Sequence, residues 1–94
     1  MQVFVTPNAE EDFDLIVQEI RKQWGERTAK QFLTKADKVF NLLKNFPAMG
    51  QKENGDIRGF QLSPQTRILY RITNSQVIIL SFFDTRQDPA KRLG

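Results

Sequence analysis

The sequence has 94 residues, of which 39% are hydrophobic and 27% charged, with a formal net charge of +3. This length and composition predict one small globular domain over residues 1–94 and exclude a disordered chain. Cysteine and histidine are both missing, which excludes disulfides, thiolate chemistry and the commonest metal ligand and proton-transfer side chain.

The apolar runs are all far shorter than the roughly 20 residues that span a bilayer. The start, Met1 to Val5, lacks the basic and long apolar stretches of a secretory signal. We therefore expect a cytoplasmic protein with no membrane partner, no cofactor and no metal. Residues 1–20 carry five acidic and no basic side chains, whereas residues 21–94 carry 14 basic and six acidic ones. This basic majority is typical either of a protein with an anionic partner or of an ordinary solvated surface.

The first half of the chain predicts a short strand followed by two helices. Val3 to Val5 is a short apolar run, and Thr6-Pro7 is a typical helix start, with threonine as N-cap and proline in the first turn. Gly25 predicts the end of the first helix and the start of the second, which runs to about Asn45. Apolar side chains recur at helical spacing: Ala9, Phe13, Ile16, Ile20 and Trp24 in the first helix, and Ala29, Phe32, Leu33, Ala36, Val39, Phe40 and Leu43 in the second. The two helices should form an antiparallel hairpin with Trp24 in the core.

The second half predicts a turn-rich loop over residues 47–56 and then three strands, at 57–62, 66–73 and 76–83. The strand at 66–73 alternates, with Ile68, Tyr70 and Ile72 on one face and Arg67, Leu69 and Arg71 on the other. The strand at 76–83 is apolar on both faces, which is typical of a central strand. Residues 84–94 are polar and predict a flexible tail.

These elements predict an α+β fold of order β-α-α-β-β-β, with a helical hairpin packed on one face of a small, mainly antiparallel sheet. The first strand is expected beside the last one. The other face of the sheet is then half apolar and half cationic, because it carries Arg67, Leu69 and Arg71. Two alternatives follow: a bound partner covers this face, or the long loop or the tail folds over it.

Several strings of the sequence fall in the order typical of one protein family. They are Val-Phe-Val-Thr-Pro-Asn-Ala-Glu-Glu-Asp-Phe at 3–13, Trp24-Gly25, Phe46-Pro47 with Gly50, Arg67 to Ile72, and Phe-Phe-Asp-Thr-Arg-Gln-Asp-Pro at 82–89. Together they resemble the RelE/ParE superfamily of type II toxin–antitoxin systems over essentially the whole chain. The last string is similar to the D-T-R-x-x-P ending of many ParE-like or plasmid-stabilisation proteins.

The resemblance implies a toxin that a cognate antitoxin neutralises by wrapping its C-terminal segment around it. Operator DNA would be contacted only through the antitoxin. RelE-like members cleave mRNA on the ribosome, whereas ParE-like members bind and poison DNA gyrase. A third alternative is an orphan member that keeps the fold without the toxicity.

RNA cleavage by 2′-OH attack needs a base, an acid and cations around the phosphate. By resemblance, Arg67 and Arg86 fall where the nucleases carry arginines, but Gly59 and Gln61 stand where they carry lysines. Tyr70 is the last tyrosine, and its strand face places it in the core. Arginine stays protonated and is a poor proton shuttle, so these residues favour a non-enzymatic inhibitor over a nuclease.

The sequence thus predicts a growth-arresting, ParE-like gyrase inhibitor, with a RelE-like nuclease as the alternative. The residues expected to contact the target or the antitoxin are Arg67, Leu69, Arg71, Arg86, Lys91 and Arg92. The alternative for each arginine is a solvated side chain or a surface ion pair. Arg86 should be exposed, and it follows directly after the apolar strand, where rigid backbone holds its side chain, which favours a functional role. Asp84 and Asp88 could in principle act as bases, but their flanking residues favour a role in turns and caps.

Overall fold

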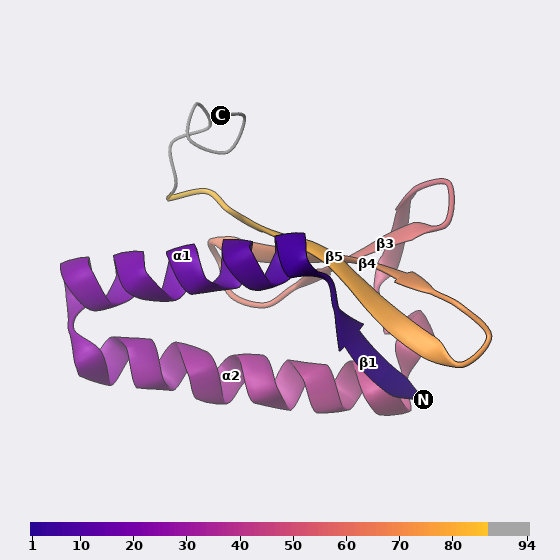
Figure 1. The fold of residues 1–94 in the computed structure, drawn as a ribbon, viewed down its shortest axis with the longest axis horizontal. Helices are drawn as coiled ribbons and strands as arrows, with labels where there is room; N and C mark the ends of the chain where they lie inside the picture. Colours follow the sequence, from indigo (N-terminus) through magenta and orange to yellow (C-terminus); the bar gives the residue numbers. More distant parts are fainter. Residues whose placement is uncertain (87–94) are drawn as a thin grey trace.

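The computed structural model describes residues 1–86. The order of elements is β1 (Gln2–Val5), α1 (Pro7–Trp24), α2 (Glu26–Asn45), a short 3-10 helix η1 (Pro47–Met49), β2 (Gln51–Asn54), β3 (Ile57–Gln61), β4 (Thr66–Ile72) and β5 (Gln76–Asp84) (Figure 1). Both predicted helices are confirmed, as are the four predicted strands. Asp84, which was predicted to open a polar tail, still belongs to β5; residues 87–94 of that predicted tail lie outside the described part of the chain.

The helix boundaries follow from local chemistry. The Thr6 hydroxyl accepts a hydrogen bond from the Ala9 backbone N–H at 3.1 Å, and Pro7 occupies the first helical position. Gly25 has a φ of 96°, a conformation that favours glycine, and its N–H bonds the Arg21 carbonyl at 3.0 Å to close α1. The chain reverses there, so that α1 and α2 form the expected antiparallel hairpin (Figure 1).

The sheet has five strands in the order β1-β5-β4-β3-β2. Strand β1 pairs in parallel with β5, as the sequence predicts for its position, and the other neighbours are antiparallel. The prediction that residues 47–56 form only a loop is wrong, since they contain η1 and β2. All four residues of β2 are exposed and carry no apolar alternation, and the strand exists because the turn at Gly55 (φ 60°) folds it back on β3.

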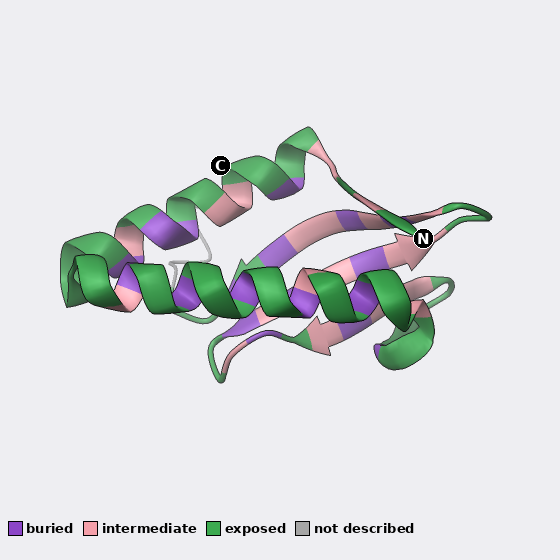
Figure 2. Cartoon of the chain, turned by 90° about the horizontal axis from the view of Figure 1, so that it is seen from below, coloured by how far each residue is buried: buried purple, intermediate pink, exposed green. Residues whose placement is uncertain are grey.

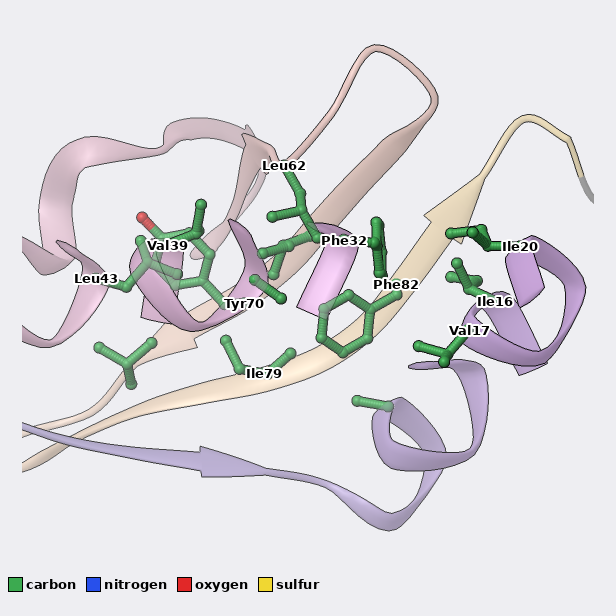
Figure 3. Packing of buried hydrophobic residues seen from close by; sticks show 14 of the residues in the cluster. Ile16, Val17, Ile20, Phe32, Val39, Leu43, Leu62, Tyr70, Ile79 and Phe82 are labelled. Carbon is green, nitrogen blue, oxygen red and sulfur yellow. The ribbon is translucent and has the colours of Figure 1, made fainter. Parts of the chain in front are cut away.

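The core lies between the helical hairpin and one face of the sheet (Figure 3). Strand β4 contributes Ile68 and Tyr70, and β5 contributes Val77, Ile79 and Phe82. The side chains of β5 that face the core are at odd positions up to Ile79 and at even positions from Phe82. This change occurs because a bulge in β5 lies opposite Leu69 and Tyr70 of β4. This bulge lets both ends of an all-apolar strand place their side chains in the same core.

The bulge also docks α1 on the sheet. At the bulge the Leu80 carbonyl accepts hydrogen bonds from the side chains of Thr6 at 3.4 Å and Asn8 at 3.3 Å. The Phe82 N–H donates to the Asp12 carboxylate at 3.2 Å. Polar side chains of the N-cap and the first turns of α1 thus bond backbone groups at the point where the strand ladder is irregular.

Two predicted core residues lie at the surface instead. Trp24 is 62% exposed, because it is the last residue of α1 at an end of the hairpin that projects beyond the sheet (Figure 1). Leu33 is 37% exposed, at the margin of the buried stripe of α2. Within residues 1–86, neither helix is both long and apolar enough to cross a bilayer.

Candidate functional site

The sheet face that points away from the helices brings together three of the predicted site residues. Arg67, Leu69 and Arg71 project from β4, and their cross-strand partners on β5 are Phe83, Ser81 and Ile78. Ile78 in turn pairs with Phe4 of β1. Phe4 and Phe83 are 47% and 43% exposed. This outer face therefore combines arginines with apolar side chains, as the strand alternation predicts.

Both arginines of the outer face are bound by carboxylates from the β2–β3 hairpin. Arg67 forms an ion pair with Glu53 and also donates to the Gln61 side-chain oxygen at 3.1 Å. The Arg71 Nε lies 3.0 Å from an Asp56 carboxylate oxygen, in an ion pair whose geometry makes no hydrogen bond. Residues 47–56, which were predicted to form a loop, thus place two carboxylates on this face. This agrees in part with the alternative that the long loop of the same chain covers the face.

Gly59 makes the pairing between Arg67 and Glu53 possible. A side-chain carbon at position 59 would collide with the Glu53 carboxylate and with the Arg67 guanidinium. Gly59 is on β3, directly opposite Leu69 of β4. At this position it lies between the Glu53 carboxylate and the Arg67 guanidinium. Sequence reasoning missed Glu53 and Asp56 as partners; their position on either side of the Asn54-Gly55 turn is the signal that could have identified them.

Arg86 is held at the end of β5 by a buried carboxylate. Asp84, only 1% exposed, accepts hydrogen bonds from the Arg86 backbone N–H at 2.8 Å, Nε at 2.9 Å and Nη2 at 2.6 Å, and from the Thr66 hydroxyl at 2.5 Å. Arg86 is exposed as a residue, as expected, but its guanidinium is bound to Asp84 and its side chain is only 30% exposed, which is the ion-pair alternative. The physical reason is that Asp84 still belongs to β5 and points inward beside Thr66.

The electrostatics of this network follow from competing effects. Burial alone would raise the pKa of the Asp84 carboxyl, but the hydrogen bonds from Arg86 and Thr66 outweigh burial and lower that pKa below its ordinary value. The hydrogen bond to Asp84 in turn raises the pKa of Arg86. The expected role of Asp84 in turn chemistry is confirmed, since it caps the backbone N–H two residues ahead.

Tyr70 lies in the core, as its strand face predicts, with no exposed surface. Its hydroxyl donates to the Pro47 carbonyl at 2.7 Å and accepts from the Gly50 N–H at 2.8 Å. A side-chain carbon at Gly50 would lie 2.7 Å from the tyrosine ring, so that glycine is required for this contact. Tyr70 therefore fixes the turn that follows α2 and has no free hydroxyl to offer a substrate.

The arrangement can bind anionic or carboxylate-bearing partners through arginine, but it offers little for proton transfer. The sequence has no histidine, and its only tyrosine is Tyr70. Within residues 1–86, acidic side chains do not gather into a group that could hold a metal ion. Lys91 and Arg92, the remaining predicted contact residues, and Asp88 lie outside the described residues.

Comparison with known proteins places this geometry in context. A family model described as the ParE toxin of the type II toxin–antitoxin system parDE matches residues 3–89. Toxin ParE3 of Caulobacter vibrioides is 29% identical to this chain over 86 residues, which span 88% of this chain and 85% of that protein.

Two solved structures share the fold. A chain of the chromosomal ParDE toxin–antitoxin system from P. aeruginosa superposes with a TM-score of 0.77 at 18% identity, covering 89% of this chain and 95% of that one. A chain of the E. coli DinJ-YafQ complex does so with a TM-score of 0.60 at 15% identity, covering 90% of this chain and 93% of that one. The predicted α+β arrangement of a helical hairpin on a mainly antiparallel sheet is thus confirmed.

Proposed function

The chain belongs to the ParE family of toxins from type II toxin–antitoxin systems, and we propose that it arrests growth by binding and inhibiting DNA gyrase. Toxins of this family act with cognate antitoxins. In this proposal a cognate antitoxin neutralises the chain, which acts in the cytoplasm as one domain over residues 1–94.

The observation that carries the proposal is that the candidate polar side chains, on the outer face and at the end of β5, offer no group that readily releases or accepts a proton. Arg67, Arg71 and Arg86 are all paired with carboxylates, and arginine does not release its proton near neutral pH. Asp84, the buried acid, has a lowered pKa and is saturated by donors, so it is a weak base. A chain that acts by binding needs none of these groups to transfer a proton.

Arginine paired with an internal carboxylate remains suited to recognition. The pairs of Arg67 and Arg71 lie at a partly exposed surface, where an ion pair is worth only about 0–1 kcal/mol. A carboxylate of a target or of an antitoxin can therefore exchange for Glu53 or Asp56 at small cost. The apolar side chains beside them, Phe4 and Phe83, supply the contact area that a protein interface needs.

The test is to induce the chain in cells that carry a reporter of DNA damage while the integrity of cellular mRNA is followed. The proposal expects growth arrest, reporter activation and intact mRNA. Rapid loss of mRNA on translating ribosomes without reporter activation would replace it with the RelE-type nuclease. Normal growth at a verified level of folded protein would instead indicate an orphan member.

A further inference from the structure

Basic side chains fall into two classes in this structure. Those expected to form the site, Arg67, Arg71 and Arg86, are each neutralised by a carboxylate of the same chain. Helix α2 carries five basic side chains, and none of them takes part in an ion pair within the described residues: Arg27, Lys30, Lys35, Lys38 and Lys44. The largest group of unpaired positive charge in this part of the chain is therefore on a helix that the outer face of the sheet does not include.

Six side chains form what we call the α2 ridge. Together with Glu26 they line an open surface depression on the solvent side of the helix; the six are Arg27, Lys30, Gln31, Thr34, Lys35 and Lys38. All six are exposed, and the exposed surface of α2 faces the viewer in Figure 2. From Arg27 to Lys38 the ridge extends about 16 Å along the helix axis, at a rise of about 1.5 Å per residue.

The helix does not neutralise this ridge. Arg27 and Lys30 are three residues apart, as are Lys35 and Lys38, and like charges at helical neighbour spacing lower helix stability by about 0.2–0.5 kcal/mol per pair. The single acidic residue three or four positions from any of these cations is Glu26, and it is bound by Arg21 at 2.6 Å. The ridge therefore costs folding stability, which favours a role in binding.

The composition of the ridge selects among anionic partners. It contains neither an aromatic nor a large apolar side chain, whereas protein interfaces use such residues as anchors and single-stranded nucleic acids stack their bases on aromatic rings. A duplex needs neither, because cations that track its phosphates supply the affinity. We propose that the α2 ridge binds the phosphate backbone of duplex DNA without reading base sequence. The identity of this duplex as DNA held by gyrase rests on the proposed function.

The test measures fluorescence anisotropy of a labelled 20-base-pair DNA duplex with the purified full chain between 50 and 200 mM salt. Four phosphate contacts predict that log affinity falls with log salt at a slope of about −3.6, or a loss of about 150-fold over this range. Replacing Lys30→Gln together with Lys38→Gln should make the slope about 2 less negative. The matched control, Lys22→Gln with Lys52→Gln, removes the same charge from exposed positions on α1 and β2 and should keep the original slope. Residues 87–94 are present in every variant, so any contribution from Lys91 and Arg92 cancels.

Equal slopes for the ridge and control variants would overturn the inference, and so would tighter binding to an RNA duplex or to an acidic peptide than to DNA. Unfolding curves of the ridge variant should show no loss of stability, because the substitutions relieve repulsion. Gyrase inhibition by the unmodified chain is measured in parallel. If the chain inhibits gyrase but the ridge variant binds DNA as the unmodified chain does, the inference is wrong and the proposed function stands. If DNA binding depends on the ridge but gyrase is not inhibited, the inference stands and the proposed function is wrong.

Discussion

Asp84→Asn tests the network that ends β5. The substitution keeps the size of the side chain but removes the charge that three Arg86 donors and the Thr66 hydroxyl share. Hydrogen bonds to a charged group are worth about 1.5–3 kcal/mol each in net stability. The Arg86 side chain is 30% exposed and regains water when its partner is neutralised, so the total loss of stability should be about 2 kcal/mol. For a domain of this size that corresponds to a fall of about 8–16 °C in Tm.

The assay is urea or thermal unfolding followed by circular dichroism at pH 7 and at pH 3. Because hydrogen bonds lower the pKa of Asp84 in the folded state, its contribution is present above the ordinary aspartate pKa of about 3.9 and is lost as the pH falls through the folded value. The difference between the native chain and Asp84→Asn should therefore narrow in acid. Asp37→Asn, the same chemical change at an exposed position of α2, is the control and should change stability little. A difference below about 0.5 kcal/mol at pH 7, or one that grows in acid, would refute the reasoning.

Three further predictions concern other parts of the molecule. Tyr70→Phe leaves the buried Gly50 N–H and the partly buried Pro47 carbonyl without their hydroxyl partner and should cost about 2 kcal/mol in urea unfolding; loss of toxicity at unchanged stability, as expected of a catalytic tyrosine, would contradict the structural role. Arg67→Gln should weaken toxicity in a growth assay, with Glu53→Gln as the control that breaks the same ion pair but keeps the arginine, and both should keep Tm within a few degrees. Trp24→Ala should change unfolding free energy by less than about 1 kcal/mol, because the ring is mostly exposed; a core-sized loss would contradict the structure.

The helices could be predicted because their signals are local. Thr6, Pro7 and Gly25 determine the two boundaries of α1 within a few residues of themselves, and the apolar spacing gives the buried face. The positions of Arg67, Leu69 and Arg71 on one sheet face could be predicted for the same reason, since alternation in a strand requires no knowledge of its neighbours.

What the sequence did not reveal depends on contacts between distant residues. The bulge in β5 is defined only by its pairing with β4, so an all-apolar strand gives no sign of where its parity changes. Strand β2 has no apolar pattern and exists through its pairing with β3. The Arg67–Glu53 pair needs Gly59 between them, and the inward position of Asp84, which binds Arg86, follows from the register of β5 against Thr66.

The most direct test of a toxin that acts by binding is a titration of purified DNA gyrase with the purified chain, in which supercoiling of a relaxed plasmid is measured. The account predicts that supercoiling falls as the protein is added and reaches its minimum near stoichiometric amounts, while mRNA on translating ribosomes stays intact at the same concentrations. Unaffected supercoiling, together with mRNA cleavage at amounts far below those of the ribosomes, would contradict it.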